Sequence, residues 1–336
     1  MKVLIVQTAF LGDVILTIPL IRALKKHIKP VHLHILLRPE AEDVYRNDKD
    51  IDNIIVYDKK NSEKGIQHLF KLIKKVRAEK YELVISPHRS VRSALISYLS
   101  GAKQRVGFDK NSMSILYNKK VKYINDKHEV ERNLSLIEPI YDGEISITLN
   151  MQNSENDRKK ADELISNTVR AAGQDIVCMA PGSEWSTKRW LTEYYRKLIK
   201  LCSLSDIKVV LLGGSKDKNI CGNISIGFEN VTDLSAKLSV NESSEVMKQC
   251  KLLVCNDTGA MHIGSASGID IITVFGPTVP EFGFSPFGVK NKILQSDIYC
   301  RPCSIHGGEN CPEGHFLCMR SITPDDVMQE IRRFLN

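Results

Sequence analysis

The sequence predicts an α/β protein with two Rossmann-like domains, each built on a parallel sheet. Short apolar runs alternate with longer amphipathic stretches, and this alternation restarts after a polar, unpatterned stretch at Thr148–Asp157. Alternating strands and helices are typical of parallel sheets with helices on both faces. The length of 336 residues agrees with two domains, because single cores rarely grow past ~250–300 residues.

The first half contains four continuous apolar runs, as expected of parallel strands that are buried on both faces. These strands are expected at Lys2–Gln7, Val31–Leu37, Asn53–Tyr57 and Leu83–Ser86, with helices at Val14–His27 and Gly65–Lys80.

The second half repeats the pattern after a helix expected at Asp157–Ala172. Thr323 and Pro324 have the residue types of an N-cap and a first helical position, so a last helix is expected there. The expected strands are Ile176–Ala180, Lys208–Leu212, Leu252–Cys255 and Ile271–Phe275, and the expected helices are Thr192–Cys202, Ser243–Lys248, Gly259–Ser267 and Thr323–Leu335.

The composition excludes several protein classes. With 42% hydrophobic and 26% charged residues, the chain is neither disordered nor fibrous. No apolar run reaches the ~18 residues of a membrane span. Asp13 interrupts the N-terminal apolar run too early for a secretory signal. A reducing, cytoplasmic location is expected because five of the nine cysteines are scattered, at Cys178, Cys202, Cys221, Cys250 and Cys255.

The net charge of +7 is uneven along the chain. Residues 1–150 carry 26 Lys and Arg against 18 Asp and Glu, so the whole excess lies in the first half. Such a half suits a nucleic acid, an anionic membrane surface or a phosphorylated substrate, or is a solvated lysine face. A nucleic-acid-binding module is disfavoured, because aromatic residues make up only 7% and no recognition motif is present.

The first strand ends in the loop Gln7–Asp13, where ligands of an open parallel sheet bind. The loop has one glycine, Gly12, which disfavours the G-x-G-x-x-G of a nicotinamide site. Asp13 either caps the first helix or acts as a general base.

Two loops of the second half have phosphate-binding chemistry. Gly182, Ser183 and Lys188 join backbone amides, a hydroxyl and a cation, although a turn with surface cations has the same composition. At Asp257-Thr258-Gly259 a helix begins, and its free amides suit a pyrophosphate.

Two further residues have competing roles. His262 points either to a ligand or into the core. Asp217, in Gly213-Gly214-Ser215-Lys216-Asp217, either accepts hydrogen bonds from a ribose or caps a helix, and Gly276-Pro277-Thr278 ends a further strand at the same pocket.

In combination, these motifs closely resemble those of the ADP-heptose:lipopolysaccharide heptosyltransferases, glycosyltransferase family 9. The matching motifs are F-L-G-D-V, M-A-P-G-S-x-W-x-x-K-R-W, N-D-T-G-x-M-H-I and V-F-G-P-T, in the same order over nearly the whole chain.

The resemblance implies the GT-B fold, in which two Rossmann-like domains have parallel sheets facing each other across a cleft. Residues 1–152 would bind the acceptor and 153–322 the nucleotide-sugar, and the helix at 323–336 would pack back on the first domain.

The resemblance also implies an inverting transfer of heptose from ADP-heptose to the inner core of lipopolysaccharide. Asp13 matches the catalytic base and Lys188 the phosphate-binding lysine. No divalent metal or other cofactor is required for catalysis. The donor would be bound by Gly182, Ser183, Lys188, Asp217, Asp257, Thr258, Gly259, Met261 and His262.

The acceptor implied by the resemblance is anionic, which gives the basic first half a role. His88, Arg89, Arg92 and Arg105 flank the fourth expected strand and the R-V-G-F segment after it. Arg89, Arg105 and Gly12 are the expected acceptor-binding residues. Peripheral contact with the cytoplasmic face of the inner membrane is also expected.

The segment Cys300-x2-Cys303-x7-Cys311-x6-Cys318 has the spacing of a structural zinc or iron site. Reduced thiols and disulfides are the alternatives. A similar Cys-rich segment is common in the family, and some related protein heptosyltransferases bind iron there.

Other functions fit the same fold. A GT-B transferase with another nucleotide-sugar or a protein acceptor is the first alternative, because the same fold serves other nucleotide-sugars and specificity lies in details of the pocket. A nucleotide-sugar epimerase shares the architecture, but it needs further acid/base groups around the sugar ring.

Overall fold

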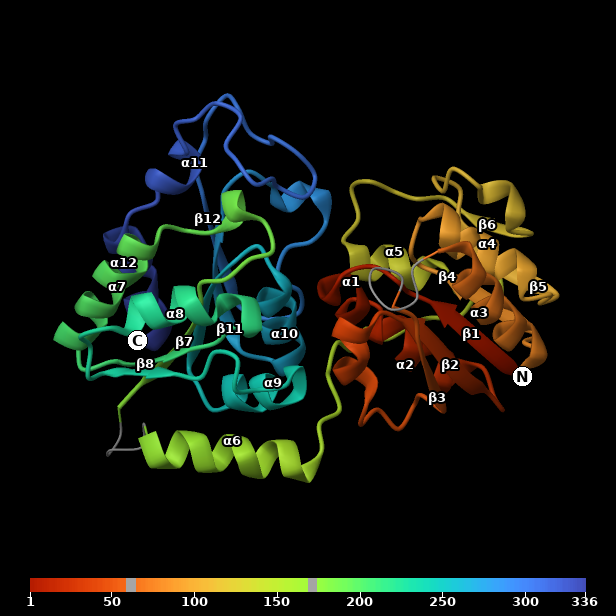
Figure 1. The fold of residues 1–336 in the computed structure, drawn as a ribbon, viewed down its shortest axis with the longest axis horizontal. Coiled ribbons are helices and arrows are strands. Elements are labelled where there is room, and N and C mark those ends of the chain that lie inside the picture. Colours follow the sequence, from red (N-terminus) through yellow and green to blue (C-terminus); the bar gives the residue numbers. More distant parts are fainter. Residues whose placement is uncertain (59–64, 169–173) are drawn as a thin grey trace. The chain divides into compact units, whose positions relative to one another are not determined.

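The computed structural model describes residues 1–58, 65–168 and 174–336. The chain divides into two compact units, Met1–Gln152 and Asn153–Asn336. Each unit has one six-stranded parallel sheet with helices packed around it (Figure 1).

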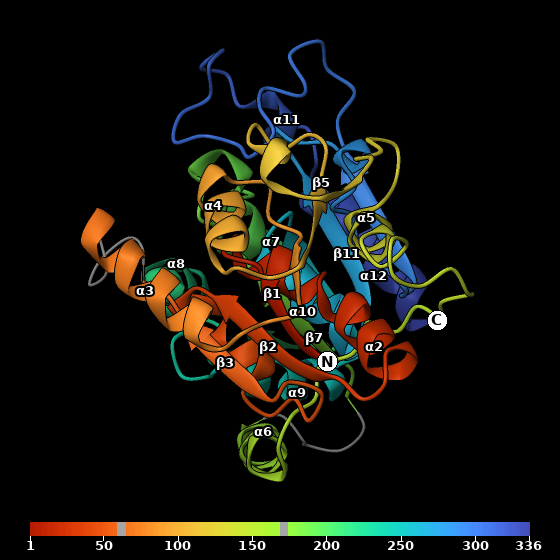
Figure 2. The same cartoon turned by 90° about the vertical axis from the view of Figure 1, so that its right-hand side faces the viewer.

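The first sheet has the strand order β3-β2-β1-β4-β5-β6, and β1, β2 and β3 lie side by side in Figure 2. This is the order of a Rossmann fold, in which the strand order reverses between β1 and β4. Its strands are β1 (Lys2–Val6), β2 (His32–Leu37), β3 (Asn53–Val56), β4 (Leu83–Ser86), β5 (Gln104–Phe108) and β6 (Lys119–Val121).

The helix predicted at Val14–His27 is two helices in the structure, α1 (Leu11–Ile15) and α2 (Ile18–His27). Pro19 lies in the first turn of α2 and has no N–H to donate to Ile15, so one continuous helix cannot form. The other helices of this unit are η1 (Pro39–Tyr45), α3 (Ile66–Ala78), α4 (Val91–Leu99), η2 (Ser114–Leu116) and α5 (Glu129–Ser135).

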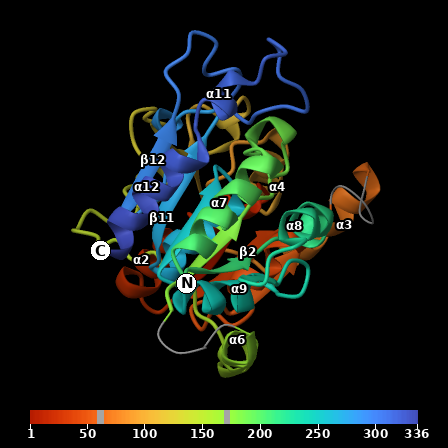
Figure 3. The same cartoon turned by 90° about the vertical axis from the view of Figure 1, so that its left-hand side faces the viewer.

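The second sheet has the order β12-β11-β10-β7-β8-β9, which repeats the topology of the first (Figure 3). Here the strand order reverses between β7 and β10. Its strands are β7 (Ile176–Ala180), β8 (Lys208–Leu211), β9 (Val231–Asp233), β10 (Leu252–Asn256), β11 (Asp270–Phe275) and β12 (Asn291–Gln295).

The predicted helices of the second half are present, although the predicted end at 169–172 of the first one lies outside the described residues. The helices are α6 (Glu155–Thr168), η3 (Ser186–Lys188), α7 (Thr192–Leu204), η4 (Ser215–Asp217), α8 (Lys218–Ser225), α9 (Val240–Lys248), α10 (Gly259–Ser267), η5 (Pro280–Phe282), α11 (Leu317–Arg320) and α12 (Pro324–Leu335).

Four strands were not predicted, namely β5, β6, β9 and β12. Two of them, β6 and β9, have only three residues. The edge strand β12 is largely exposed and carries little apolar signal. In β5, Gly107 interrupts the apolar pattern because the ring of Tyr117 occupies the space that a side chain would need.

The apolar face of α12 packs within the second unit, and the packing of this helix on the first domain stays a prediction. Val327, Met328 and Ile331 are buried in the core of the second unit, where α12 packs on α7 and β11. Figure 3 shows α12 alongside α7. The periodicity of the sequence identifies the apolar face of this helix but contains no information about its partner.

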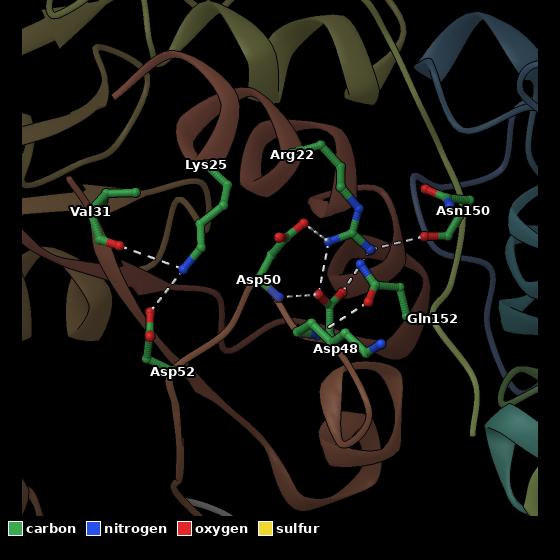
Figure 4. A network of polar contacts seen from close by, with 9 residues as sticks. Arg22, Lys25, Val31, Asp48, Asp50, Asp52, Asn150 and Gln152 are labelled. Carbon is green, nitrogen blue, oxygen red and sulfur yellow. Dashed lines mark hydrogen bonds and ion pairs between the residues drawn. The ribbon is translucent and has the colours of Figure 1, made fainter. Parts of the chain in front are cut away.

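A buried ion pair fixes the last residues of the first unit (Figure 4). Arg22 of α2 donates to Asp48 at 2.7 Å and 2.9 Å, to Asp50 at 2.8 Å and to the carbonyl oxygen of Asn150 at 3.1 Å. Gln152 accepts a hydrogen bond from the amide of Lys49 at 3.2 Å. The polar stretch predicted as a linker is therefore attached to the first unit up to Gln152.

Among the described residues, every helix falls short of the combined length and apolar character that crossing a membrane requires.

Candidate active site

Asp13 lies in α1, just after the carboxyl end of β1, and is half-buried. Its carboxylate accepts a hydrogen bond from the amide of Phe10 at 3.2 Å, and Phe10, not Asp13, is the N-cap residue. The hydroxyl of Thr17 donates to the carbonyl oxygen of Asp13 at 2.8 Å. The neighbouring Gly12 is buried. Asp13 is therefore held in place by both its side chain and its backbone.

The surroundings of Asp13 favour its protonated form, so its pKa lies above that of an ordinary aspartate. Burial is the main cause, followed by the charge of Glu129, and together they raise the pKa of Asp13 to about 7. The amide of Phe10 and the cation of Arg89 act in the opposite direction. A carboxyl with a pKa near neutrality suits general acid–base catalysis at neutral pH.

The loop after β4 lies next to the loop after β1, because the two strands pair directly. His88 Nδ1 and the hydroxyl of Thr8 are 3.0 Å apart and join the two loops. Arg89 is exposed, and its guanidinium stacks 3.9 Å from the ring centroid of Tyr123. This arrangement brings Arg89, a predicted acceptor-binding residue, to the same edge of the sheet as Asp13.

Arg105, the other predicted acceptor-binding arginine, lies elsewhere. It is near the amino end of β5, and it donates to the carbonyl oxygens of Ala102 at 2.7 Å and Leu116 at 3.0 Å. This guanidinium holds backbone segments together. The prediction treated R-V-G-F as a segment after the fourth strand, whereas it lies within β5.

In the second unit, the loop after β7 contains Gly182 and Ser183 and leads into η3, which ends at Lys188. A side chain at Gly182 would collide with the carboxylate of Asp217, so the glycine lets this residue of the β8 loop approach. Asp217 accepts a hydrogen bond from the amide of Gly214 at 2.9 Å. Asp217 has the predicted capping geometry, and its carboxylate lies at the same loop as Gly182.

Lys188 forms a largely buried ion pair with Asp257, with Nζ and Oδ2 2.6 Å apart. Asp257 follows β10, and the hydroxyl of Thr278 donates to the same oxygen at 2.6 Å. The structure therefore brings together residues from three loops that follow β7, β10 and β11. This cluster lies where the strand order reverses, which is where open α/β sheets bind ligands.

The helix α10 begins at Gly259 directly after this cluster, with Thr258 as its N-cap residue. The Thr258 hydroxyl is buried and has no hydrogen-bond partner within the described part of the chain. Amides at a helix N-terminus and the helix dipole favour an anion. Met261 and His262 lie further along α10 and are both buried, with exposed fractions of 0% and 5%.

Asn256, the last residue of β10, was not predicted as part of the site. Its side chain accepts a hydrogen bond from the amide of Trp190 at 3.1 Å and donates to the carbonyl oxygen of Pro181 at 2.9 Å. It thereby fixes the loop after β7 against β10. A polar residue at the end of an otherwise apolar strand is the sequence signal that identifies it.

The predicted metal site in the Cys-rich segment is not supported. Within residues 1–58, 65–168 and 174–336, no three His, Cys, Asp or Glu side chains are grouped to hold a metal ion. All nine cysteines are free thiols. Burial raises the pKa of Cys303, and it raises that of Cys318 to about 11. The spacing satisfies the sequence criterion for a metal site, but the fold of the segment does not bring the thiols into a ligand set.

The same segment instead supports the loop of Lys188. The backbone of Gly308 exchanges hydrogen bonds of 2.8 Å with the hydroxyl of Thr187, and Gly307 packs against Lys188. Cys303, Cys311 and Cys318 line a cavity of about 180 Å³ that also borders Thr187.

Comparison with known proteins gives the same family throughout. The model of glycosyltransferase family 9 (heptosyltransferase) matches residues 69–313. The chain is 25% identical over 340 residues to lipooligosaccharide heptosyltransferase 2 of Campylobacter jejuni, with 99% of each protein covered.

Two solved structures have the same fold. The glycosyl transferase family 9 protein of Veillonella parvula gives a TM-score of 0.89 at 22% identity, covering 99% of this chain and 97% of that one. Escherichia coli heptosyltransferase WaaC was solved with ADP-2-deoxy-2-fluoro heptose. It gives a TM-score of 0.73 at 22% identity, with 99% of each chain covered. These likenesses confirm the predicted GT-B fold. Because the family model covers most of the chain, the protein is an enzyme that belongs to glycosyltransferase family 9, the heptosyltransferases.

Proposed function

We propose that this enzyme transfers heptose from ADP-heptose to the inner core of lipopolysaccharide, with inversion at the anomeric carbon. The observation that carries the proposal is the cluster of Lys188, Asp257 and the N-terminus of α10 at the point where the second sheet reverses its strand order. Such a cluster has the charge and the amide donors that a nucleoside diphosphate requires.

In this proposal the second unit binds the donor. The amides at the start of α10 and the ammonium of Lys188 stabilise the negative charge that develops on ADP as it leaves. Asp217, beside Gly182, accepts hydrogen bonds from the ribose. Ser183 lies in the same loop as Gly182 and adds a hydroxyl at this site. The cation and the helix dipole supply the stabilisation that a divalent metal provides in other transferases.

The first unit supplies the base. Asp13 accepts the proton of the acceptor hydroxyl while that oxygen attacks the anomeric carbon and the bond to ADP breaks. A single displacement inverts the configuration, so one carboxylate is sufficient. Arg89, exposed at the same edge of the sheet as Asp13, binds the phosphate or carboxylate groups of the acceptor.

Donor selectivity tests this function directly. In calorimetric titrations in EDTA, the protein should bind ADP and discriminate against UDP and GDP. Transfer from ADP-heptose to heptose-deficient lipopolysaccharide should persist in EDTA. A preference for UDP would reassign the donor, and activity that EDTA abolishes and Mg²⁺ restores would contradict a metal-independent site. Transfer to a peptide but not to lipopolysaccharide would reassign the acceptor.

Peripheral membrane contact is the second part of the proposal, and it is supported by α3. This helix contains no acidic residue. Ile66 and Phe70, one turn apart, are 68% and 59% exposed, and Lys71 and Lys74 are exposed near them. Exposed apolar side chains next to lysines suit an anionic bilayer surface.

Vesicle sedimentation checks this contact. The Ile66→Ser/Phe70→Ser variant should bind vesicles containing phosphatidylglycerol about tenfold more weakly, because two apolar side chains no longer enter the interface. Leu204→Ser, which replaces an exposed apolar residue at the end of α7, is the matched control. Equal binding by all three proteins would exclude α3 as the contact.

A further inference from the structure

A buried network of polar side chains joins α5 to the segment after β6 in the first unit. Glu129, in the first turn of α5, accepts a hydrogen bond from Arg132 at 2.9 Å and from the hydroxyl of Tyr123 at 3.2 Å. Arg132 also donates to the Tyr123 hydroxyl at 2.8 Å. The exposed fractions of Glu129, Arg132 and Tyr123 are only 5%, 2% and 7%.

Stability alone does not account for this network. The free energy needed to remove a carboxylate and a guanidinium from water is about as large as the free energy gained from their attraction. Apolar side chains of similar volume often stabilise a core equally well. A charge placed here also changes the electrostatic potential at neighbouring groups.

The position of α5 links Glu129 to the segment that follows Asp13, because Glu129 lies one helical turn before Asn133 on the same face of α5. The helix packs on α2, and Asn133 donates a hydrogen bond of 3.1 Å to the carbonyl oxygen of Leu16, three residues after Asp13. After burial, the charge of Glu129 is the largest cause of the raised pKa of Asp13. Arg89 is the opposing charge.

The same network also positions Arg89. The ring of Tyr123 lies between two guanidinium groups, with Arg89 at 3.9 Å and Arg132 at 4.7 Å from its centroid. The hydrogen bonds of the Tyr123 hydroxyl to Glu129 and Arg132 fix the ring on which Arg89 stacks. Burial raises the pKa of Glu129 itself, whereas the hydrogen bonds from Arg132 and Tyr123 and the charge of Arg89 lower it. Asp13 is the other carboxyl on which the charge of Glu129 acts.

We propose that Glu129 is a positioning residue of the transfer reaction, whose buried carboxylate sets the charge around Asp13 and, through Tyr123, the place of Arg89. It does not touch the substrate. The proposal rests on Asp13 acting as the general base. A nearby negative charge makes Asp13 a stronger base, because the proton that it accepts lowers the local repulsion between the two carboxylates.

The pH dependence of kcat tests the proposal, because a merely structural role would not move it. In Glu129→Gln the negative charge is lost, so the midpoint of the acid limb should move to lower pH by about half a unit or more. Above that limb kcat should fall, since Asp13 is then a weaker base. Glu129→Asp keeps the charge and should restore the midpoint toward that of the parent enzyme.

Glu131→Gln is the matched control, because Glu131 lies on the exposed side of the same helical turn. It should leave the profile unchanged. An unshifted midpoint in a folded Glu129→Gln variant would overturn the proposal, as would an equal shift in Glu131→Gln.

A direct titration covers the case in which Glu129→Gln does not fold. The ¹³C NMR signal of the Asp13 carboxyl, assigned by its absence in Asp13→Asn, should titrate near neutrality in the parent and in Glu129→Asp. An ordinary acidic midpoint in both would overturn the inference. If the parent enzyme does not transfer heptose at all, the proposed function fails, whereas a normal parent with unmoved variants contradicts only the role of Glu129.

Discussion

Asp13→Asn should reduce kcat for heptose transfer by about 10²–10⁴-fold, the range that a positioned general base contributes. Asparagine has the same shape as aspartate and its side-chain oxygen still accepts the amide hydrogen bond of Phe10, so α1 stays capped. What it cannot do is accept the proton of the acceptor hydroxyl. Initial rates with ADP-heptose and a heptose-deficient acceptor measure the loss.

The pH dependence of kcat in the parent enzyme is a second test of Asp13 as the general base. Since the pKa of Asp13 is raised to about 7, the base is ionised above that pH and protonated below it. The kcat for transfer should therefore fall as the pH drops through about 7. An acid limb near pH 4 would mean that an ordinary carboxylate, and not Asp13 in this environment, limits the reaction.

Stability provides the control for folding. A carboxyl whose pKa is higher in the folded than in the unfolded chain destabilises the folded state once the pH exceeds the unfolded value. Asp13→Asn removes that cost, so its melting temperature should exceed that of the parent above pH 7, and the difference should shrink toward pH 4. Its affinity for ADP should be unchanged. Near-normal kcat in this variant would mean that Asp13 only stabilises the start of α1, through its hydrogen bond with the Phe10 amide.

Lys188→Ala should weaken ADP binding by about 1.5–3 kcal/mol, or roughly 10- to 150-fold, the scale of a charge-assisted hydrogen bond. The ion pair with Asp257 adds to the loss, because the variant leaves a carboxylate that is 9% exposed facing the diphosphate. Calorimetric titration with ADP measures both effects together.

Two further variants separate these effects. In Lys188→Ala/Asp257→Asn the unpaired charge is gone, so part of the ADP affinity should return. Lys216→Ala is the matched control, because Lys216 is an exposed lysine of the β8 loop that pairs with Glu184. ADP affinity that is unchanged in Lys188→Ala, or equally reduced in Lys216→Ala, would remove Lys188 from the donor site.

Much of the fold follows from local patterns. The strands at Leu83–Ser86 and Ile176–Ala180 and the helix at Gly259–Ser267 have the predicted bounds. Their signals depend on neighbouring residues, such as an unbroken apolar run or a glycine after a cap. Three of the four missed strands have three residues or lie at an exposed edge, where the apolar signal is weak. In the fourth, β5, Gly107 interrupts the apolar run.

The candidate site was predictable to the same degree. Each motif was expected at the carboxyl end of a strand, and the parallel sheets place Asp13, Arg89, Lys188 and Asp257 in such loops. Arg105 was misplaced because the strand that contains it was not recognised.

The sequence alone determined the alternation of strands and helices, the division into two Rossmann-like units and the loops that carry the chemistry. These features follow from hydrophobic periodicity and turn residues, which act over a few positions. Only the tertiary structure decided which side chains meet, namely Lys188 with Asp257, Asp217 with Gly182, and α12 with α7. It also kept the four cysteines from forming a ligand set and joined Glu129 to the Tyr123 ring on which Arg89 stacks. The physical reason is that such contacts depend on the shape and charge of surfaces brought together from distant parts of the chain, which no local pattern encodes.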